Sequence, residues 1–139
     1  MKLLVATDGS KNSVKAVRQA AKLVQGATEG GTITLVSVHD DTALRHAQRF
    51  VGKDAVDSYL RDLSEKDLAE SRKVLDKADV KHDMVIRTGH VATEIAALGS
   101  KYDMIVMGSK GRTAFKDLLI GSVAQRVLEL SKVPVLFVK

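Results

Sequence analysis

Short apolar stretches alternate with helical patterns along the whole chain. Residues 2–7 are apolar almost throughout, which is typical of a strand buried on both faces. Residues 11–25 follow as a predicted helix, because one set of apolar residues recurs there at spacings of three and four. This set is Val14, Val17, Ala21 and Val24. Ser10 stands directly before the helix and is a suitable N-cap residue.

The alternation continues to the end of the chain. Further strands are predicted at residues 32–38, 83–88, 103–107 and 133–138, and further helices at residues 54–77, 92–98 and 123–130. Residues 39–53 read as an irregular polar stretch. The long helix is expected to contact the core through Val56, Leu60, Leu63 and Leu75, and its apolar stripe drifts after Leu63. Strands that alternate with helices indicate parallel βαβ units with right-handed crossovers. We therefore predict one three-layer α/β/α domain over residues 1–139, with a five-stranded parallel sheet.

Composition narrows the class of protein. The chain has 139 residues, 45% of them hydrophobic and 28% charged, which is ordinary for a globular domain. It contains no cysteine, so neither disulfides nor thiolate metal sites are expected. The net charge of +5 is spread along the chain and only 4% of residues are aromatic, which argues against nucleic acid as a partner. No apolar run approaches the length of a membrane span or a signal segment, so we expect a cytoplasmic protein without a membrane partner.

The most informative motif is glycine-rich. Residues 108–122 read GSKGRTAFKDLLIGS, with glycines spaced as G-x2-G-x9-G and a serine after the last one. The run starts at the end of an apolar strand and finishes at the start of a helix. Glycines let the backbone approach an oxyanion, and the free N–H groups of the first helical turn point toward it. The run matches neither the dinucleotide fingerprint nor the Walker motif, so it predicts a phosphate site of another kind.

Together these motifs resemble the universal stress protein family, in the branch whose members bind ATP. The likeness spans the chain and is carried by ATDGS at residues 6–10, VSV at 36–38, Gly89, MGSKG at 107–111, LLIGSVA at 118–124 and VPVL at 133–136. The resemblance implies an adenine nucleotide alpha hydrolase-like sheet with the strand order 3-2-1-4-5. The first and fourth strands are then neighbours, and a crevice opens where their ends meet. Asp8 and Gly108 would face this crevice together.

The resemblance also implies roles for individual residues. Gly108 and Gly111 would let the backbone wrap the ribose and phosphates of ATP, with ADP and AMP as alternative ligands and Mg²⁺ as the accompanying ion. Gly121, Ser122 and Val123 would offer N–H groups to the phosphates. Lys110 and Arg112 would add positive charge there, Asp8 would accept hydrogen bonds from the adenine or ribose, and the Val38 backbone would contact adenine. The implied site comprises Ala6, Thr7, Asp8, Val38, Met107, Gly108, Ser109, Lys110, Gly111, Arg112, Gly121, Ser122, Val123 and Ala124.

Ordinary structural roles remain as alternatives at several positions. Asp8 could cap the first helix, Ser122 could cap the fourth, and Val38 could simply line the core. The cluster at residues 39–41, His-Asp-Asp, could touch a ligand or Mg²⁺, or form a solvated turn. The four histidines show no metal-ligand spacing, so no metal site is expected.

Three functions stay open at this point: an ATP-binding regulatory module, a hydrolase of the related adenine-nucleotide type, and a nucleotide-independent interaction module. Such hydrolases use a double-glycine loop, Ser-Gly-Gly-x-Asp-Ser, which residues 7–10 lack. No catalytic residue is evident, so we expect a regulatory protein and not an enzyme. Residues 133–138 form an apolar strand at the sheet edge in the implied order. The resemblance and this exposed edge together predict a homodimer through that strand.

Overall fold

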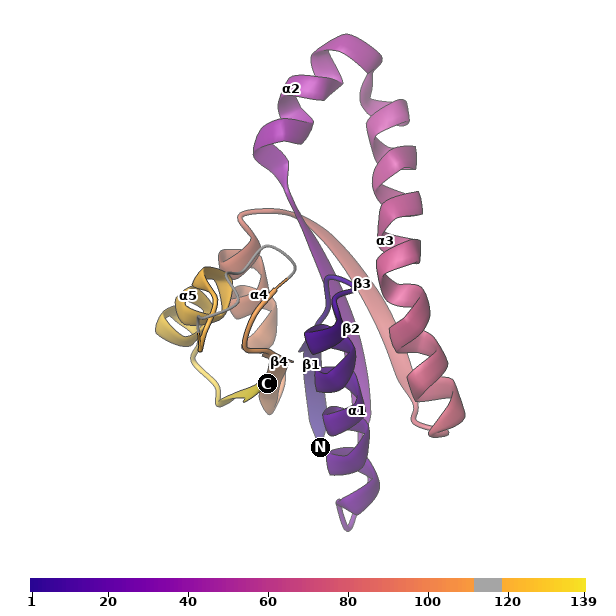
Figure 1. Ribbon diagram of the computed structural model, residues 1–139, viewed down its shortest axis with the longest axis vertical. Helices are drawn as coiled ribbons and strands as arrows, with labels where there is room; N and C mark the ends of the chain where they lie inside the picture. The colour runs from indigo at the N-terminus through magenta and orange to yellow at the C-terminus, as the bar shows by residue number, and fades with distance from the viewer. Residues whose placement is uncertain (112–118) are drawn as a thin grey trace.

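The computed structural model describes residues 1–111 and 119–139 and contains a parallel sheet in the order β3-β2-β1-β4-β5 (Figure 1). The strands are β1 (Lys2–Ala6), β2 (Thr32–Asp40), β3 (His82–Gly89), β4 (Met104–Gly108) and β5 (Val135–Val138). Both the predicted fold class and the strand order are confirmed. Because β1 pairs with β4 in parallel register, with Val5 opposite Val106, the carboxyl ends of these two strands lie side by side. The two edges of the sheet are formed by β3 and β5.

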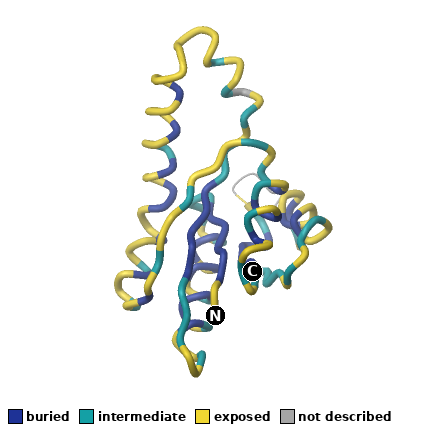
Figure 2. The backbone as a smooth tube through the Cα atoms, turned by 180° about the vertical axis from the view of Figure 1, so that it is seen from behind, coloured by how far each residue is buried: buried dark blue, intermediate teal, exposed yellow. Residues whose placement is uncertain are grey.

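Alternate residues of the central strand face two different helical layers. Leu3 and Val5 join a buried cluster with α1 (Lys11–Gly26) and α3 (Lys53–Lys77). Leu4 and Ala6 join a second cluster with α4 (Val91–Gly99) and α5 (Ser122–Leu130). Burial on both faces explains why β1 reads as a continuous apolar run in the sequence. Figure 2 shows the buried residues concentrated along the central strands, with exposed residues on the outside of the helices.

The polar stretch predicted as irregular is instead a helix, α2 (Asp41–Val51), and that prediction was wrong. The Asp40 side chain caps this helix by accepting a hydrogen bond from the Thr42 N–H at 2.8 Å. Arg45 and Asp41 form an ion pair one turn apart at 2.8 Å. The helix has few large apolar residues, although Leu44, Ala47 and Val51 recur in it at helical spacing. The cap at Asp40 and packing on α3 stabilise it further.

Gly52 allows the chain to turn sharply from α2 into α3. Its φ of 85° lies in the left-handed region, which side chains rarely adopt. The resulting helical hairpin extends beyond the end of the sheet (Figure 1). We call residues 41–63 of this hairpin the arm.

The long helix α3 faces the sheet with both apolar and polar side chains. Val56, Leu60 and Leu75 are buried as predicted, whereas Leu63 is only half-buried. The stripe continues past Leu60 through Ser64, Asp67, Leu68 and Ser71, all of them buried. The apolar pattern therefore drifts because polar residues occupy core-facing positions, and not because the helix changes its face.

Candidate functional site

A cavity of about 430 Å³ opens at the carboxyl ends of β1 and β4, where the topology of the sheet reverses. Open α/β sheets bind ligands at such a switch point. The cavity is lined by Ala6, Thr7, Asp8, Ser13, Val36, Val38, Val91, Ile95, Met107, Gly108, Lys110, Gly111, Gly121, Ser122, Val123 and Ala124. Twelve of the residues that the sequence placed in a nucleotide site are in this set. Ser109 is buried beside the cavity, and Arg112 lies outside the described residues.

The loop after β1 is fixed by its own side chains. The Ser10 N–H donates to Asp8 Oδ1 at 2.9 Å, and the Gly9 N–H donates to Thr7 Oγ1 at 3.3 Å. Ser10, as predicted, caps α1 by accepting a hydrogen bond from the Ser13 N–H at 3.2 Å. Asp8 therefore does not cap the helix; it holds the turn and presents its carboxylate at the cavity wall.

The three glycines of the motif have different surroundings. A Cβ atom at residue 108 would lie 3.0 Å from Cβ of Asn12 and 3.1 Å from the Asn12 carbonyl carbon, so Gly108 permits close packing of β4 on α1. A Cβ atom at residue 111 would lie 3.0 Å from Asp8 Oδ2, so Gly111 lets the two loops meet. At Gly121 a Cβ atom would find ordinary contacts, the nearest at 3.5 Å.

A hydrogen bond joins the two ends of the glycine-rich run. The Gly121 N–H donates to the Ser109 carbonyl oxygen at 2.6 Å, and the Ser109 N–H donates to the Val138 oxygen at 2.8 Å. Gly121 occupies the N-cap position of α5 without any side-chain cap, so Ser122 is the first helical residue and not the cap that the sequence suggested. The first-turn N–H groups of a helix have no intrahelical partner and carry its positive dipole end. In α5 this end borders the cavity, next to Lys110.

An apolar wall on the other side of the cavity was only partly predicted. Val36 and Val38 point the same way along β2, and Val91 and Ile95 lie one turn apart on α4. Sequence reasoning found Val38 alone. The strand period of two was an available signal for Val36, which lies two residues before Val38. Ser13 was missed as well, and it reaches the cavity from the first turn of α1.

The His-Asp-Asp cluster at residues 39–41 does not line this cavity. Asp40 caps α2, and the hydrogen bonds from Thr42 lower the pKa of its carboxyl. His39 Nε2 lies 3.2 Å from Ser37 Oγ and 2.7 Å from Ser64 Oγ. Burial lowers the pKa of His39 below its ordinary value, and the charge of Asp67 opposes this shift. Within residues 1–111 and 119–139, no group of three or more acidic or histidine side chains is placed to hold a metal ion.

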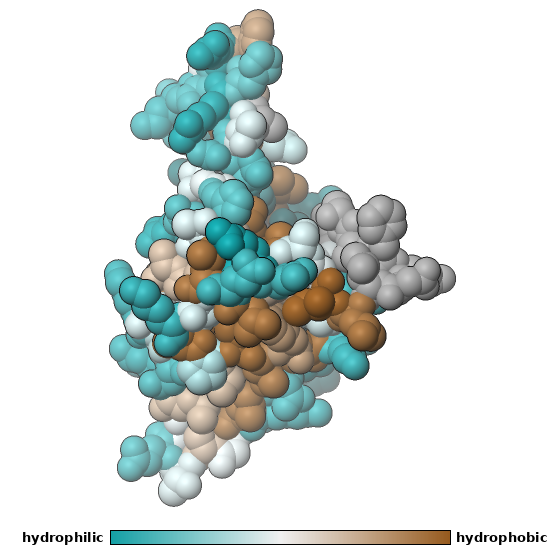
Figure 3. Space-filling view, turned by 90° about the vertical axis from the view of Figure 1, so that its left-hand side faces the viewer, coloured by the Kyte–Doolittle hydropathy of each residue, from teal (hydrophilic) through white to brown (hydrophobic). Residues whose placement is uncertain are grey.

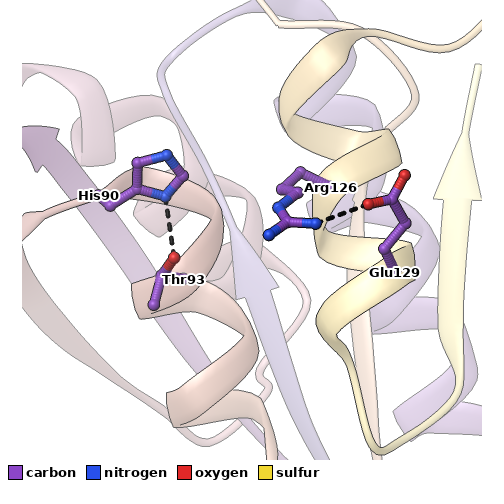
Figure 4. A network of polar contacts seen from close by, with 4 residues as sticks. All are labelled: His90, Thr93, Arg126 and Glu129. Carbon is purple, nitrogen blue, oxygen red and sulfur yellow. Dashed lines mark hydrogen bonds and ion pairs between the residues drawn. The ribbon is translucent and has the colours of Figure 1, made fainter.

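Polar pairs on α4 and α5 stabilise these helices outside the cavity. Figure 4 shows His90 and Thr93 at the start of α4, with 2.9 Å between Nδ1 and Oγ1. It also shows Arg126 of α5, which donates to Glu129 at 2.7 Å. Both pairs are exposed and local to one helix, and none of the four residues lines the cavity.

Comparison with known proteins gives a consistent result over the whole chain. The sequence profile of the universal stress protein family matches residues 1–139. Universal stress protein MJ0531 of Methanocaldococcus jannaschii is 31% identical over 147 aligned positions, which cover 99% of this chain and 81% of that protein. The solved structure of protein MJ0577 from the same organism superposes with a TM-score of 0.84 at 26% identity, and covers 99% of this chain and 94% of its own.

Two other solved structures that share the fold hold an adenine nucleotide. A universal stress protein in complex with cAMP superposes with a TM-score of 0.67 at 21% identity, and the match covers 100% of this chain and 97% of that one. A protein of the same family from Arabidopsis thaliana, with AMP bound, superposes with a TM-score of 0.68 at 18% identity, covering 100% and 91%.

Proposed function

Because this chain belongs to the universal stress protein family, we propose that it binds ATP in the cavity between β1 and β4 and acts as a regulatory module in a stress response. One observation carries the proposal. The 2.6 Å hydrogen bond from Gly121 to Ser109 brings the glycine loop and the uncapped start of α5 to one wall of the cavity. Backbone N–H groups of this kind, at a helix N-terminus beside a glycine loop, suit phosphate oxygens.

The remaining walls suit the other parts of an adenine nucleotide. Val36, Val38 and Ile95 provide an apolar surface for a flat base. The Asp8 carboxylate lines the same cavity beside Gly111 of the glycine loop, and it can accept hydrogen bonds from ribose hydroxyls. A volume of about 430 Å³ is within the usual range for small-molecule sites.

The nucleotide complexes of structural relatives support an adenine nucleotide in general, with cAMP in one and AMP in another. We favour ATP because Lys110 and the start of α5 supply positive potential at one end of the cavity. In our proposal Mg²⁺ arrives with the phosphates, since Mg²⁺ is usually held by one or two carboxylates together with substrate phosphates. Asp8 is the carboxylate that lines the cavity.

We propose a binding protein and not an enzyme, with no catalytic residue assigned. Phosphoryl transfer needs a residue that orients the attacking water and a cation placed on the transferring group. Among the described lining residues, Asp8 is the one carboxylate, and its Oδ1 already accepts the Ser10 N–H. We therefore expect turnover far below about 1 per second, the lower end for ordinary enzymes.

The edge strand β5 offers a surface for pairing with a second copy. Half-buried β5 lies at the sheet edge, and Figure 3 shows apolar side chains gathered on the side of the molecule that carries α5. Leu119, Val123 and Leu128 are exposed large apolar residues of this region. We propose that β5 of two copies pair there as a homodimer, which satisfies the open strand edge. We place the protein in the cytoplasm, where ATP is available; within the described residues, no helix has both the length and the apolar character needed to cross a bilayer.

Calorimetric titration of the purified protein with ATP and Mg²⁺ tests the function. We expect saturable binding of ATP, and much weaker binding of CTP, because the apolar wall favours the larger purine base. Heat denaturation followed by chromatography should identify adenine nucleotide carried through purification. Absence of binding at millimolar ATP would refute the proposal, and multiple turnover above about 1 per second would favour the hydrolase alternative.

A further inference from the structure

The tip of the arm exposes large apolar side chains far from the cavity. Phe50 is 78% exposed, Val51 is 62% exposed and Tyr59 is 60% exposed. Figure 1 shows that the arm projects beyond the sheet, and Figure 3 shows apolar surface at its end among hydrophilic residues. These side chains contribute nothing to the core, and exposed apolar groups at a protruding tip are typical of an interaction surface.

The two helices of the arm carry opposite charge. Helix α2 contains one acidic residue, Asp41, and two basic ones, Arg45 and Arg49, and Lys53 follows as the first residue of α3. The rest of the arm, residues 54–63 of α3, contains three acidic residues and one basic one. Arg45 pairs with Asp41 inside α2, whereas no ion pair in the described part of the chain includes Arg49 or Lys53. The positive helix and the negative helix therefore each present charges outward at the tip.

We propose that the arm is a self-association surface, in which α2 of one copy packs against α3 of a second copy around a two-fold axis. A surface that pairs with itself must be self-complementary. A hairpin with one basic and one acidic helix meets this condition, because the two-fold axis creates two identical contacts, each between α2 of one copy and α3 of the other. The pairing would place four helices together and cover Phe50, Val51 and Tyr59. An anionic membrane fits less well, because Asp54 directly follows Lys53 and Asp57 lies one helical turn further on.

The association is weak when it acts alone. Two short hairpin tips bury less than the area of a standard stable interface, and small interfaces belong to transient complexes. A second contact that already holds two copies together, such as pairing through β5, would raise the effective concentration of the arms. The arm would then link copies into assemblies larger than the β5 pair.

The absence of cysteine from the chain allows a reporter that is specific to the tip. Ser58→Cys introduces a near-isosteric thiol at an exposed position of α3, and pyrene attached there forms an excimer when two tips meet. We expect excimer emission to grow over a concentration series that reaches about 0.5 mM, the range suited to a small interface. Phe50→Ser in the same labelled protein should weaken the association about tenfold. Pyrene at Ser100→Cys, exposed after α4, is the control and should give no excimer from arm pairing.

Charge reversal distinguishes pairing between copies from effects inside one arm. Arg49→Glu with Lys53→Glu makes both helices acidic, and Asp54→Lys with Asp57→Lys makes both tips basic. Each variant alone should lose the excimer, and an equimolar mixture of the two should recover it, because opposite charges then face each other in both halves. Circular dichroism of each variant checks that the arm keeps its helices.

Other outcomes would overturn the proposal. One is an excimer that Phe50→Ser and both charge reversals leave unchanged. A second is failure of the mixture to recover the excimer signal. A third is a tip that forms no excimer in solution but binds phosphatidylglycerol vesicles. None of these readouts depends on nucleotide, so failure here leaves the proposed ATP site untouched.

Discussion

Nε2 of His39 lies 2.7 Å from Oγ of Ser64, and this contact joins the end of β2 to the middle of α3. Asp67 of the same helix is buried one turn further on and acts electrostatically on His39. A further turn along, Ser71 Oγ lies 3.4 Å from Thr7 Oγ1 at the end of β1. We call Ser64, Asp67 and Ser71 the polar seam of α3. The helix is thus held on the sheet by directional contacts as well as by apolar packing.

The polar seam makes stability depend on pH through His39. The pKa of His39 is lowered in the folded state, so folding favours the neutral ring. Its stabilising contribution is complete above the unfolded pKa of about 6.5, and is lost as the pH falls through the lower folded value. We expect the melting temperature of the wild type to fall more between pH 7.5 and pH 5 than that of His39→Gln, which keeps a hydrogen-bonding end group without titrating. Parallel pH profiles for the two proteins would contradict this assignment.

Gly121 tests the phosphate end of the cavity. Gly121→Ala fits, because its Cβ would meet only ordinary contacts at 3.5 Å or more, whereas Gly121→Asp adds a carboxylate at the start of α5. We expect ATP affinity to fall about 10- to 100-fold in Gly121→Asp through repulsion of the phosphates, and to change less than about threefold in Gly121→Ala. Calorimetric titration measures both. Equal loss in the two variants would mean that shape, and not charge, governs this position.

Gly108 should matter for stability even without ligand. In Gly108→Ala the new Cβ would press on the Asn12 backbone at 3.1 Å, where α1 begins. We expect a loss of about 1–3 kcal/mol in the free energy of unfolding, measured by urea denaturation. Gly26→Ala is the matched control: it has open space around its Cβ and lies at the end of α1, so it should be neutral or slightly stabilising. A stable Gly108→Ala protein would show that β4 and α1 can move apart at little cost.

Pairing through β5 predicts the mass in solution. Light scattering at about 5 μM should give twice the 15.0 kDa of the chain. At that concentration we expect pairing through β5 to persist and the smaller contact between arms to dissociate. Phe137→Lys, at the β5 edge, should shift the mass toward the monomer. Met84→Lys on β3, the opposite edge, should leave the dimer intact. A wild-type monomer would refute the β5 dimer.

The sheet could be predicted because its three central strands, β1, β2 and β4, are mostly buried and clear turns separate strands from helices. Each predicted strand ends within two residues of the observed one, and each predicted helix within one. Helix α2 escaped prediction although Leu44, Ala47 and Val51 recur in it at spacings of three and four, because the stretch around them is polar and its start depends on a local cap at Asp40. Ser64 and Ser71 misled the stripe analysis for a related reason, since their hydroxyls are buried only where strand ends supply hydrogen-bond partners.

The glycine-rich loop of the candidate site could be predicted from the sequence, whereas the apolar wall of the cavity was harder to predict. Glycine spacing located Gly108, Gly111 and Gly121, although the structure gives Gly108 a packing role that spacing alone does not distinguish from ligand contact. Val91 and Ile95 have the same appearance in sequence as any core residue of a short helix. Their place at the cavity depends on how α4 crosses the sheet, which is a property of the assembled fold.

Thr7 belongs to two structures at once. Its side chain lines the cavity, and its single hydroxyl is shared among Ser13, Ser71 and the Gly9 N–H. The cavity wall, the first turn of α1 and the long helix α3 thus share one proton and two lone pairs of a single side chain, although Ser71 lies 64 residues along the chain from Thr7.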